Sequence, residues 1–340
     1  MCKSIKNIYN SKLTYENIYN AYLRAKKGKG VKKEIIKFEI DLETNLCSIL
    51  NDLKNETYIP GEYRSFTIYE PKERVIKALP FRDRIVQQWY IEEFIKPFIV
   101  PRFINSSCAC IEGKGTLYAV NLCTKYMRIM KRKYNNYFVL QLDIKKYFNS
   151  INKDILFSIM NKYISDKKLL NLTYIFIYSG DEDGICIGNY VSQYYANIYL
   201  NELDYYIKDE LKIKYMIRYL DDIVILLKSK NECRLVKNRI EVFINNILDL
   251  KYNEKSRYYP SRIGINFCGY RIFETHKLLR VRSKKKIKRN IKIWNKYNVD
   301  KHTILVCWNA WRGHSKHANS YNFRCSMYNR LNYKEKININ

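Results

Sequence analysis

Apolar positions recur along the chain with two spacings, which predict where helices and strands lie. Helical spacing predicts helices over residues 13–28, 42–54, 82–97, 116–133, 153–164, 190–210 and 231–248. Short apolar runs predict strands over residues 63–69, 74–79, 137–143, 215–220, 223–227 and 264–273. Closely spaced runs predict hairpins at 63–79 and 215–227. Hairpins mixed with long helices are typical of an α+β fold with antiparallel sheets.

The pattern changes near residue 276. Residues 280–292 are dense in positive charge, and the chain from Lys277 onward is expected to be helical. The proline at residue 97 is expected to end the helix predicted before it. We therefore expect a central unit that ends near 276, followed by a basic helical unit.

Three carboxylates stand at the ends of predicted strands. Asp143 ends one apolar strand, and Asp221 and Asp222 occupy the tip of a hairpin about eighty residues later. If the sheet brings them together, they repel one another unless they hold cations, and hard oxygen ligands suit magnesium. The alternative is that Asp221 and Asp222 form a solvated turn, because Asp favours turns. Their position between two apolar strands favours the metal site.

Composition adds a partner class. The chain of 340 residues has 62 Lys and Arg against 33 Asp and Glu, a net charge of +29, which predicts salt-sensitive binding to a polyanion. A basic surface without a specific partner, or attachment to acidic lipid, is the alternative. The 10 cysteines are scattered, so neither a disulfide scaffold nor a structural zinc site is expected. Without a signal peptide or an apolar run of about 20 residues, we expect a cytoplasmic protein without a membrane span.

Several motifs resemble, in order and spacing, those of the reverse transcriptases. Asp143-Ile-Lys-Lys-Tyr-Phe-Asn-Ser resembles the first catalytic motif, Gly188-Asn-Tyr-Val-Ser-Gln the second and Tyr219-Leu-Asp-Asp the third. The resemblance implies a right-hand polymerase that copies a template RNA into cDNA. Its fingers would cover residues 1–136 with the N-terminal helices, its palm 137–275 with part of the fingers inserted at about 150–187, and its helical thumb 276–340.

The resemblance also implies roles at the catalytic centre. Asp143, the carbonyl of Ile144, Asp221 and Asp222 would hold two Mg²⁺ ions, for which Mn²⁺ is a possible substitute. The residues expected to bind the incoming dNTP are Lys72, Arg74, Phe148, Gly188 and Gln193. Phe148 stands at the steric gate that excludes a ribose 2′-hydroxyl, although a core phenylalanine beside Tyr147 is the alternative. Lys255 would protonate the leaving pyrophosphate, and a plain surface charge is an equal alternative.

A further set of residues is expected to hold the nucleic acid. By resemblance, Phe267, Gly269 and Tyr270 form the primer grip. The residues expected to contact template and primer are Tyr219, Arg280, Arg282, His314, Lys316 and His317. The spacing of His314 and His317 also resembles a metal pair, but packing or RNA contact is preferred because no cysteine or carboxylate is suitably close in the sequence.

Two departures from most reverse transcriptases are informative. Ile187 and Gln193 stand in the second motif where a glutamine and a proline are usual, and this pattern resembles the enzymes of diversity-generating retroelements. That resemblance implies misincorporation opposite adenine and a small basic helical accessory protein that forms a pentamer. Losing the glutamine leaves an aliphatic group near the nascent pair, so Ile187 and Gln193 are the candidate fidelity residues. The alternatives are another bacterial reverse transcriptase (of a retron, group II intron or phage-defence system) and a non-catalytic RNA-binding protein.

Overall fold

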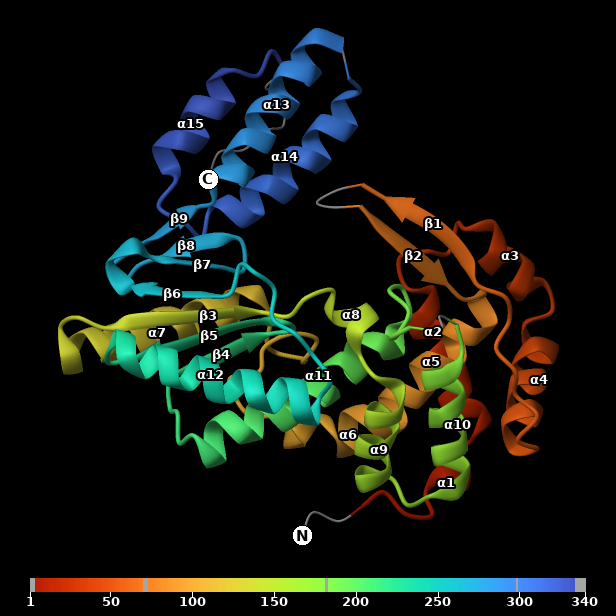
Figure 1. Ribbon diagram of the computed structural model, residues 1–340. Helices are drawn as coiled ribbons and strands as arrows, with labels where there is room; N and C mark the ends of the chain where they lie inside the picture. The colour runs from red at the N-terminus through yellow and green to blue at the C-terminus, as the bar shows by residue number, and fades with distance from the viewer. Residues whose placement is uncertain (1–3, 70–72, 181–182, 298, 334–340) are drawn as a thin grey trace.

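The computed structural model describes residues 4–69, 73–180, 183–297 and 299–333 (Figure 1). Its helices are α1 (Tyr9–Lys12), α2 (Tyr15–Lys26), α3 (Lys33–Ile40), α4 (Leu42–Lys54), α5 (Phe81–Tyr90), α6 (Lys96–Phe98), α7 (Thr116–Tyr134), α8 (Tyr147–Ser150), α9 (Lys153–Tyr163), α10 (Lys167–Tyr178), α11 (Tyr190–Tyr205), α12 (Lys230–Ile247), α13 (Val281–Tyr297), α14 (Lys301–Ser315) and α15 (Tyr321–Asn329). Its strands are β1 (Arg64–Ile68), β2 (Arg74–Ala78), β3 (Phe138–Asp143), β4 (Met216–Tyr219), β5 (Asp222–Leu227), β6 (Arg257–Pro260), β7 (Ile265–Phe267), β8 (Tyr270–Ile272) and β9 (Lys277–Leu279).

A four-stranded antiparallel sheet with the order β4-β5-β3-β6 lies at the centre of the molecule (Figure 1). Both of its faces are covered, which explains the continuous apolar run Ile223–Leu227 of β5 and the largely apolar β3, in which Gln141 is the polar exception. On β5, Ile223 and Ile225 join the core that includes α11 and α12, whereas Val224 and Leu226 join the core that includes α7. This alternation is the two-residue period of a strand.

The central sheet continues into a smaller sheet and a helical unit. Strands β7, β8 and β9 form an antiparallel sheet, and α13, α14 and α15 follow it. The three helices have a separate core that includes Ile291, Trp308 and Met327. The prediction that the chain is helical from Lys277 onward is wrong for Lys277–Leu279, which pairs with β8.

The helices between β3 and β4 return to the N-terminal part of the chain. The backbone N–H of Ile5 donates to the carbonyl of Tyr163 (2.8 Å), and that of Tyr9 donates to the carboxylate of Asp166 (3.0 Å). The end of α9 and the start of α10 are therefore held to the N-terminal segment, and α9 also packs against α10 and α11. Helix α10 was not predicted, although its buried residues Leu169, Leu172, Thr173, Phe176 and Ile177 follow helical spacing.

Most predicted elements are confirmed, and the α+β fold with antiparallel sheets is confirmed with them. The predicted helix 42–54 coincides with α4. The proline at residue 97 does not end its helix, however. A π-helical turn (Ile91–Ile95) follows α5, and Pro97 lies in the first turn of α6, where a missing N–H is tolerated.

Candidate active site

Two of the three candidate aspartates face each other on neighbouring strands. The register of β3 and β5 pairs Asp143, the last residue of β3, with Asp222, the first residue of β5. Tyr219 pairs with Asp222 across a hairpin whose two central residues are Leu220 and Asp221. The sheet therefore brings the first and third motifs together, as the sequence predicts.

The hairpin turn has an unusual backbone. Leu220 has φ 54°, the left-handed region, at the first central position of a two-residue turn. Turns of this kind usually place glycine there, and a residue with a Cβ costs about 1–2 kcal/mol in that conformation. The surrounding structure must therefore hold the turn in place.

Asp222 lies in a partly buried polar pocket. The side-chain amide of Gln141 donates to its Oδ1 (3.2 Å) and to the carbonyl of Asn266 (2.9 Å), while the hydroxyl of Tyr259 donates to Gln141 (2.9 Å). Burial raises the pKa of Asp222 to about 7, and the hydrogen bond from Gln141 opposes this rise. Arg280 also lowers this pKa, whereas the carboxylates of Asp221 and Asp143 raise it.

This raised pKa makes a stability prediction for Asp222→Asn. Since the folded protein holds this proton more tightly than the unfolded chain, the wild type loses stability as the pH rises from about 4 to about 7. The amide imitates the protonated acid, so in chelator the variant should melt a few degrees above the wild type at about pH 8 and equally at about pH 4. Circular dichroism during thermal unfolding measures the melting temperatures of the two proteins at both pH values. A variant that melts below the wild type at about pH 8 contradicts the raised pKa.

A second segment is tied to the backbone of Asp143. Asn253 donates its backbone N–H to the carbonyl of Asp143 (2.7 Å), and Ser256 both accepts from the Asp143 N–H (3.0 Å) and donates to its carbonyl (3.1 Å). Lys255 lies in this turn with an exposed side chain, and its N–H donates to the side chain of Asn253 (3.2 Å). Ile144 is buried and bridges to Tyr252.

The carboxylates fit a divalent cation that arrives with a nucleotide. In the described part of the chain, no three His, Cys, Asp or Glu side chains are gathered closely enough to hold a metal ion by themselves. Mg²⁺ usually keeps several waters and needs only one or two protein carboxylates together with substrate phosphates. Burial, and after it the carboxylates of Asp221 and Asp143, raise the pKa of Asp222, and a bound cation would oppose this rise. Asp143, Asp221 and Asp222 are the residues that would hold it.

The loop from Gly184 to Gly188 connects two other predicted sites. At its start, the N–H of Ile185 donates to the carbonyl of Phe148 (2.9 Å), the candidate steric gate, whose ring is half-buried. At its end, the carbonyl of Ile187 accepts from the N–H of Lys77 on β2 (2.9 Å). The loop thus joins the candidate gate to the β1–β2 hairpin.

Only glycine fits at the end of this loop. Gly188 has φ 131°, and a Cβ there would lie 2.4 Å from the carbonyl oxygen of Lys77. Gly188 is exposed and Ile187 is half-buried. On the same hairpin, Arg74 is exposed at the start of β2, opposite Ile68, whereas Lys72 lies outside the described residues.

Gln193 lies on the exposed face of α11, five residues after Gly188. Its side-chain oxygen accepts from the thiol of Cys110 (3.3 Å). The segment around Cys110 is also held to α11 by the side-chain amide of Asn197, which donates to the carbonyl of Ala109 (2.9 Å). The structure therefore places the Cys-Ala-Cys segment beside the second motif.

The candidate primer grip is a tight hairpin between β7 and β8. Phe267 pairs with Tyr270, and the two residues between them, Cys268 and Gly269, both have positive φ (45° and 89°), as in a type I′ turn. Helix α14 covers this turn, because the ring of Tyr270 lies 4.4 Å from that of His314 and its hydroxyl donates to the His314 carbonyl (2.7 Å). Burial lowers the pKa of His314, which favours the neutral imidazole.

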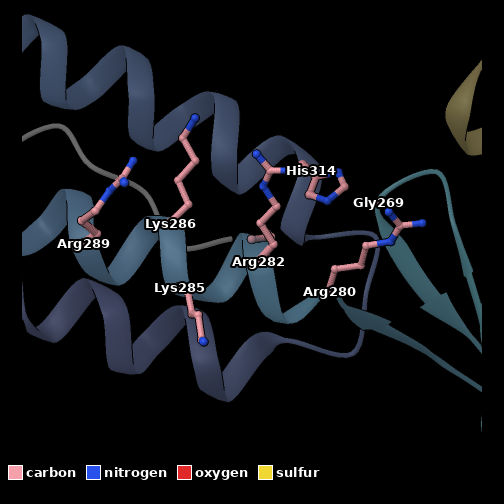
Figure 2. Close-up of a pocket in the computed structure, with 8 residues that line it drawn as sticks. Gly269, Arg280, Arg282, Lys285, Lys286, Arg289 and His314 are labelled. Atoms are coloured by element: carbon pink, nitrogen blue, oxygen red, sulfur yellow. The ribbon is translucent and has the colours of Figure 1, made fainter. Parts of the chain in front are cut away.

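A basic pocket of about 520 Å³ opens beside this hairpin (Figure 2). It is lined by Gly269, Arg280, Arg282, Ser283, Lys285, Lys286, Arg289 and His314. The Nε of Arg280 is buried and has no hydrogen-bond partner among the described residues. Such a group is satisfied by an anionic oxygen. Lys316 and His317 are exposed just beyond the end of α14, outside the residues that line the pocket.

Sequence reasoning missed a buried ion pair next to the turn that holds Asp221. Arg218 and Asp204 have no exposed surface, and the guanidinium donates to both carboxylate oxygens. An arginine between the apolar Ile217 and Tyr219, in a strand expected to be buried, was the available signal.

Comparison with known proteins gives the family. Residues 67–272 match the family model described as Reverse transcriptase (RNA-dependent DNA polymerase). The chain belongs to the reverse transcriptase family. The matched residues contain the Asp143–Asp222 pair, the Gly184–Gly188 loop and the β7–β8 hairpin, and they end before the helices α13 to α15.

Curated relatives of this reverse transcriptase include intron-encoded proteins. The COX1/OXI3 intron 2 protein of Saccharomyces cerevisiae is 25% identical over 280 residues, covering 62% of this chain and 30% of the relative. The group II intron-encoded protein LtrA of Lactococcus lactis subsp. cremoris is 24% identical over 329 residues, covering 74% of this chain and 52% of the relative. The chain thus spans about half of the length of these relatives, or less.

Solved structures of telomerase also match. That of apo telomerase from Candida tropicalis, truncated from its C-terminal domain, has a TM-score of 0.47 and 13% identity, covering 70% of this chain and 60% of that chain. Separately, no helix in the described residues of this reverse transcriptase is long and apolar enough to cross a membrane.

Proposed function

We propose that this reverse transcriptase copies a template RNA into DNA by extending a primer with dNTPs. The observation that carries the proposal is the pairing of Asp143 with Asp222 on adjacent strands, with Asp221 next to them in the turn. Two Mg²⁺ ions, held by these carboxylates and the Ile144 carbonyl, would activate the primer 3′-hydroxyl and stabilise the leaving pyrophosphate. Lys255, whose turn is bonded to Asp143, would donate a proton to that pyrophosphate.

The surroundings of the aspartates support binding of a deoxynucleotide. Phe148 lies at the start of α8, where its ring packs edge-on against that of Tyr147. Its carbonyl accepts a hydrogen bond from the N–H of Ile185 in the Gly184–Gly188 loop. A bulky ring held in this way would collide with a 2′-hydroxyl and favour dNTPs. Arg74 of the β1–β2 hairpin would bind the triphosphate together with Lys72, which lies outside the described residues. Gly188 and Gln193 would contact the new base pair.

The basic pocket supports binding of the primer–template duplex. Arg280 directly precedes α13 and Arg282 lies in its first turn, next to the β7–β8 hairpin, which contains the candidate primer grip (Figure 2). Cations on one helix attract the phosphates of a nucleic acid without reading its sequence. Tyr219, Lys316 and His317 would add contacts to the same duplex.

Primer extension tests this proposal directly. Purified protein with Mg²⁺, a defined RNA template, a DNA primer and dNTPs should give extended products, and chelator should stop the reaction. Ribonucleotides in place of dNTPs should extend poorly if Phe148 is the gate. Absence of extension on any RNA template, with the protein folded and the duplex bound, would leave the non-catalytic RNA-binding alternative.

We further propose that copying is error-prone opposite adenine and serves targeted diversification of a gene. Ile187 supports this finer proposal, because its carbonyl is anchored on Lys77 and its half-buried aliphatic side chain offers no hydrogen bond to a nascent pair. A pocket without that polar contact discriminates less between correct and wrong geometries. A small basic accessory protein would be the partner.

Ile187→Gln should lower misincorporation opposite template adenine. The added amide supplies one hydrogen bond, worth about 1 kcal/mol or a factor of about five in error rate. Sequencing of cDNA made on a defined RNA, with and without the accessory protein, measures the change. Ile187→Leu keeps an aliphatic group of the same size and should leave the errors as they are. An unchanged error spectrum in Ile187→Gln removes Ile187 from the explanation.

Intron mobility is the second candidate function, since the curated relatives are intron-encoded proteins. The DNA around the gene distinguishes the two. A diversifying element should lie near two similar repeats that differ mainly at the adenines of one copy. The gene of an intron enzyme should lie within the sequence of a group II intron. Retrons and phage-defence systems would show neither arrangement.

A further inference from the structure

Arg218 lies on β4, two residues before the turn residue Leu220, and is fully buried. Its Nε and Nη2 donate to the carboxylate of Asp204 on α11 (2.8 and 2.6 Å). Its Nη1 donates to the side-chain oxygen of Asn197 (2.9 Å) and to the carbonyl of Leu220 (3.3 Å), and Nη2 also donates to the Asn197 carbonyl (3.4 Å). Together these contacts use all five N–H donors of a guanidinium.

One of these contacts reaches the catalytic turn itself. Leu220 is the residue with left-handed backbone between Tyr219 and Asp221. Its carbonyl accepts from the guanidinium of Arg218, so a side chain of β4 is tied directly to the turn that follows this strand. A strained turn keeps its shape only where other contacts hold it, and this hydrogen bond is such a contact.

The other contacts fix the arginine to two distant segments. Asn197 links it to Ala109 through the Ala109 carbonyl. The backbone of Arg218 pairs with the same segment, since its N–H donates to the carbonyl of Ser106 (2.9 Å) and its carbonyl accepts from Cys108 (3.0 Å). Strand β4 is therefore held in two ways: its backbone is bonded to the segment from Ser106 to Cys108, and the side chain of Arg218 is bonded to α11.

Stability does not explain this arrangement. Burying two charges costs several kcal/mol per ion, and well-packed apolar residues in place of a buried ion pair are often neutral or stabilising. Burial raises the pKa of Asp204, so its carboxylate depends on the hydrogen bonds from Arg218. An apolar pair of similar volume would avoid that cost, but it would lose the bond to Leu220.

We propose that Arg218, fixed by Asp204 and Asn197, is a positioning unit that holds the Leu220 carbonyl and so sets where the Asp221 carboxylate stands. The inference rests on the proposed function, in which Asp221 holds a metal ion. It predicts that loss of the unit weakens metal binding and kcat, while the binding of primer–template is kept.

The deciding variant is the double substitution Arg218→Met with Asp204→Leu, which removes both charges together and keeps an apolar filling. Compared with the wild type, it should keep the melting temperature to within a few degrees. The kcat should fall by about tenfold to a hundredfold, as expected when reacting groups move by about 1 Å. The Mg²⁺ concentration for half-maximal rate should rise severalfold, and duplex binding should stay unchanged. Wild-type kcat and wild-type Mg²⁺ dependence in this stable variant would overturn the proposal.

Single variants separate positioning from simple loss of stability. Arg218→Lys keeps the charge but cannot fill five donor positions, so its defect should be intermediate. Asp166→Asn is the matched control. Asp166 is a buried carboxyl that caps α10 and accepts from Tyr9, among the N-terminal helices. The Asp166→Asn variant should therefore have a lower melting temperature than the wild type but the same Mg²⁺ dependence of the rate.

Direct metal binding tells a failure of this inference from a failure of the proposed function. Mn²⁺ serves as the probe, and its binding to the complex of protein, primer–template and a non-hydrolysable dNTP analogue is followed by electron paramagnetic resonance. Asp221→Ala and the double variant should both weaken it. If Asp221→Ala leaves Mn²⁺ binding intact, the metal site itself is misassigned. If Asp221→Ala weakens it and the double variant does not, only the positioning role of Arg218 is wrong.

Discussion

Asp221→Ala should abolish primer extension while leaving the protein folded and able to bind primer–template. Asp221 stands at the tip of the β4–β5 hairpin, next to the Asp143–Asp222 pair. Its carboxylate would complete the metal site, and metal charge stabilisation is worth several kcal/mol in the transition state. The expected loss is therefore on the order of a thousandfold or more in kcat.

The measurement is single-turnover extension of a DNA primer on an RNA template, at several Mg²⁺ concentrations. Asp221→Asn removes the charge with little change in shape and should fail almost as completely. Asp209→Ala is the matched control, since Asp209 is exposed on the π-helical turn after α11 and should keep wild-type activity. Extension by Asp221→Ala at the wild-type rate would show that the metal site lies elsewhere.

Gly188→Ala should cause the second-largest loss, through the geometry of the nucleotide pocket. An added Cβ would stand 2.4 Å from the carbonyl oxygen of Lys77, which belongs to backbone and cannot swing away. The loop must then move off β2 and lose the bond between Lys77 and Ile187. A displacement of about 1 Å at a reacting site costs on the order of a hundredfold, so we expect that loss in kcat/KM for dNTPs.

Gly28→Ala is the control for Gly188→Ala. It introduces the backbone strain of an alanine with positive φ without the steric clash of an added Cβ. Gly28 has φ 71°, but a Cβ there meets no atom within 4 Å. This control should lose about 1–2 kcal/mol of stability and keep its kinetic constants. Steady-state extension with varied dNTP concentration measures both variants. If Gly188→Ala behaves like Gly28→Ala, the contact between the loop and β2 has no role in nucleotide binding.

The local patterns of the sequence predicted the elements that carry the site. The apolar run that ends at Asp143 predicted β3, and the paired runs around Asp221 and Asp222 predicted the β4–β5 hairpin, because strand period and turn chemistry are local properties. Element ends were less certain. The π-helical turn before Pro97 and the strand at Lys277–Leu279 depend on packing rather than on local preference.

What the sequence by itself determined is the set of chemical groups and their order. The motif around Tyr219, the aspartate at 143 and the excess of positive charge were all readable before any coordinates, and they predicted a polymerase that binds nucleic acid. Only the tertiary structure decided which groups meet. The register of β3 against β5 places Asp143 opposite Asp222, and long-range packing puts Asp204 and Asn197 around Arg218. Contacts between residues far apart in sequence come from burying surfaces together, and no local propensity specifies them.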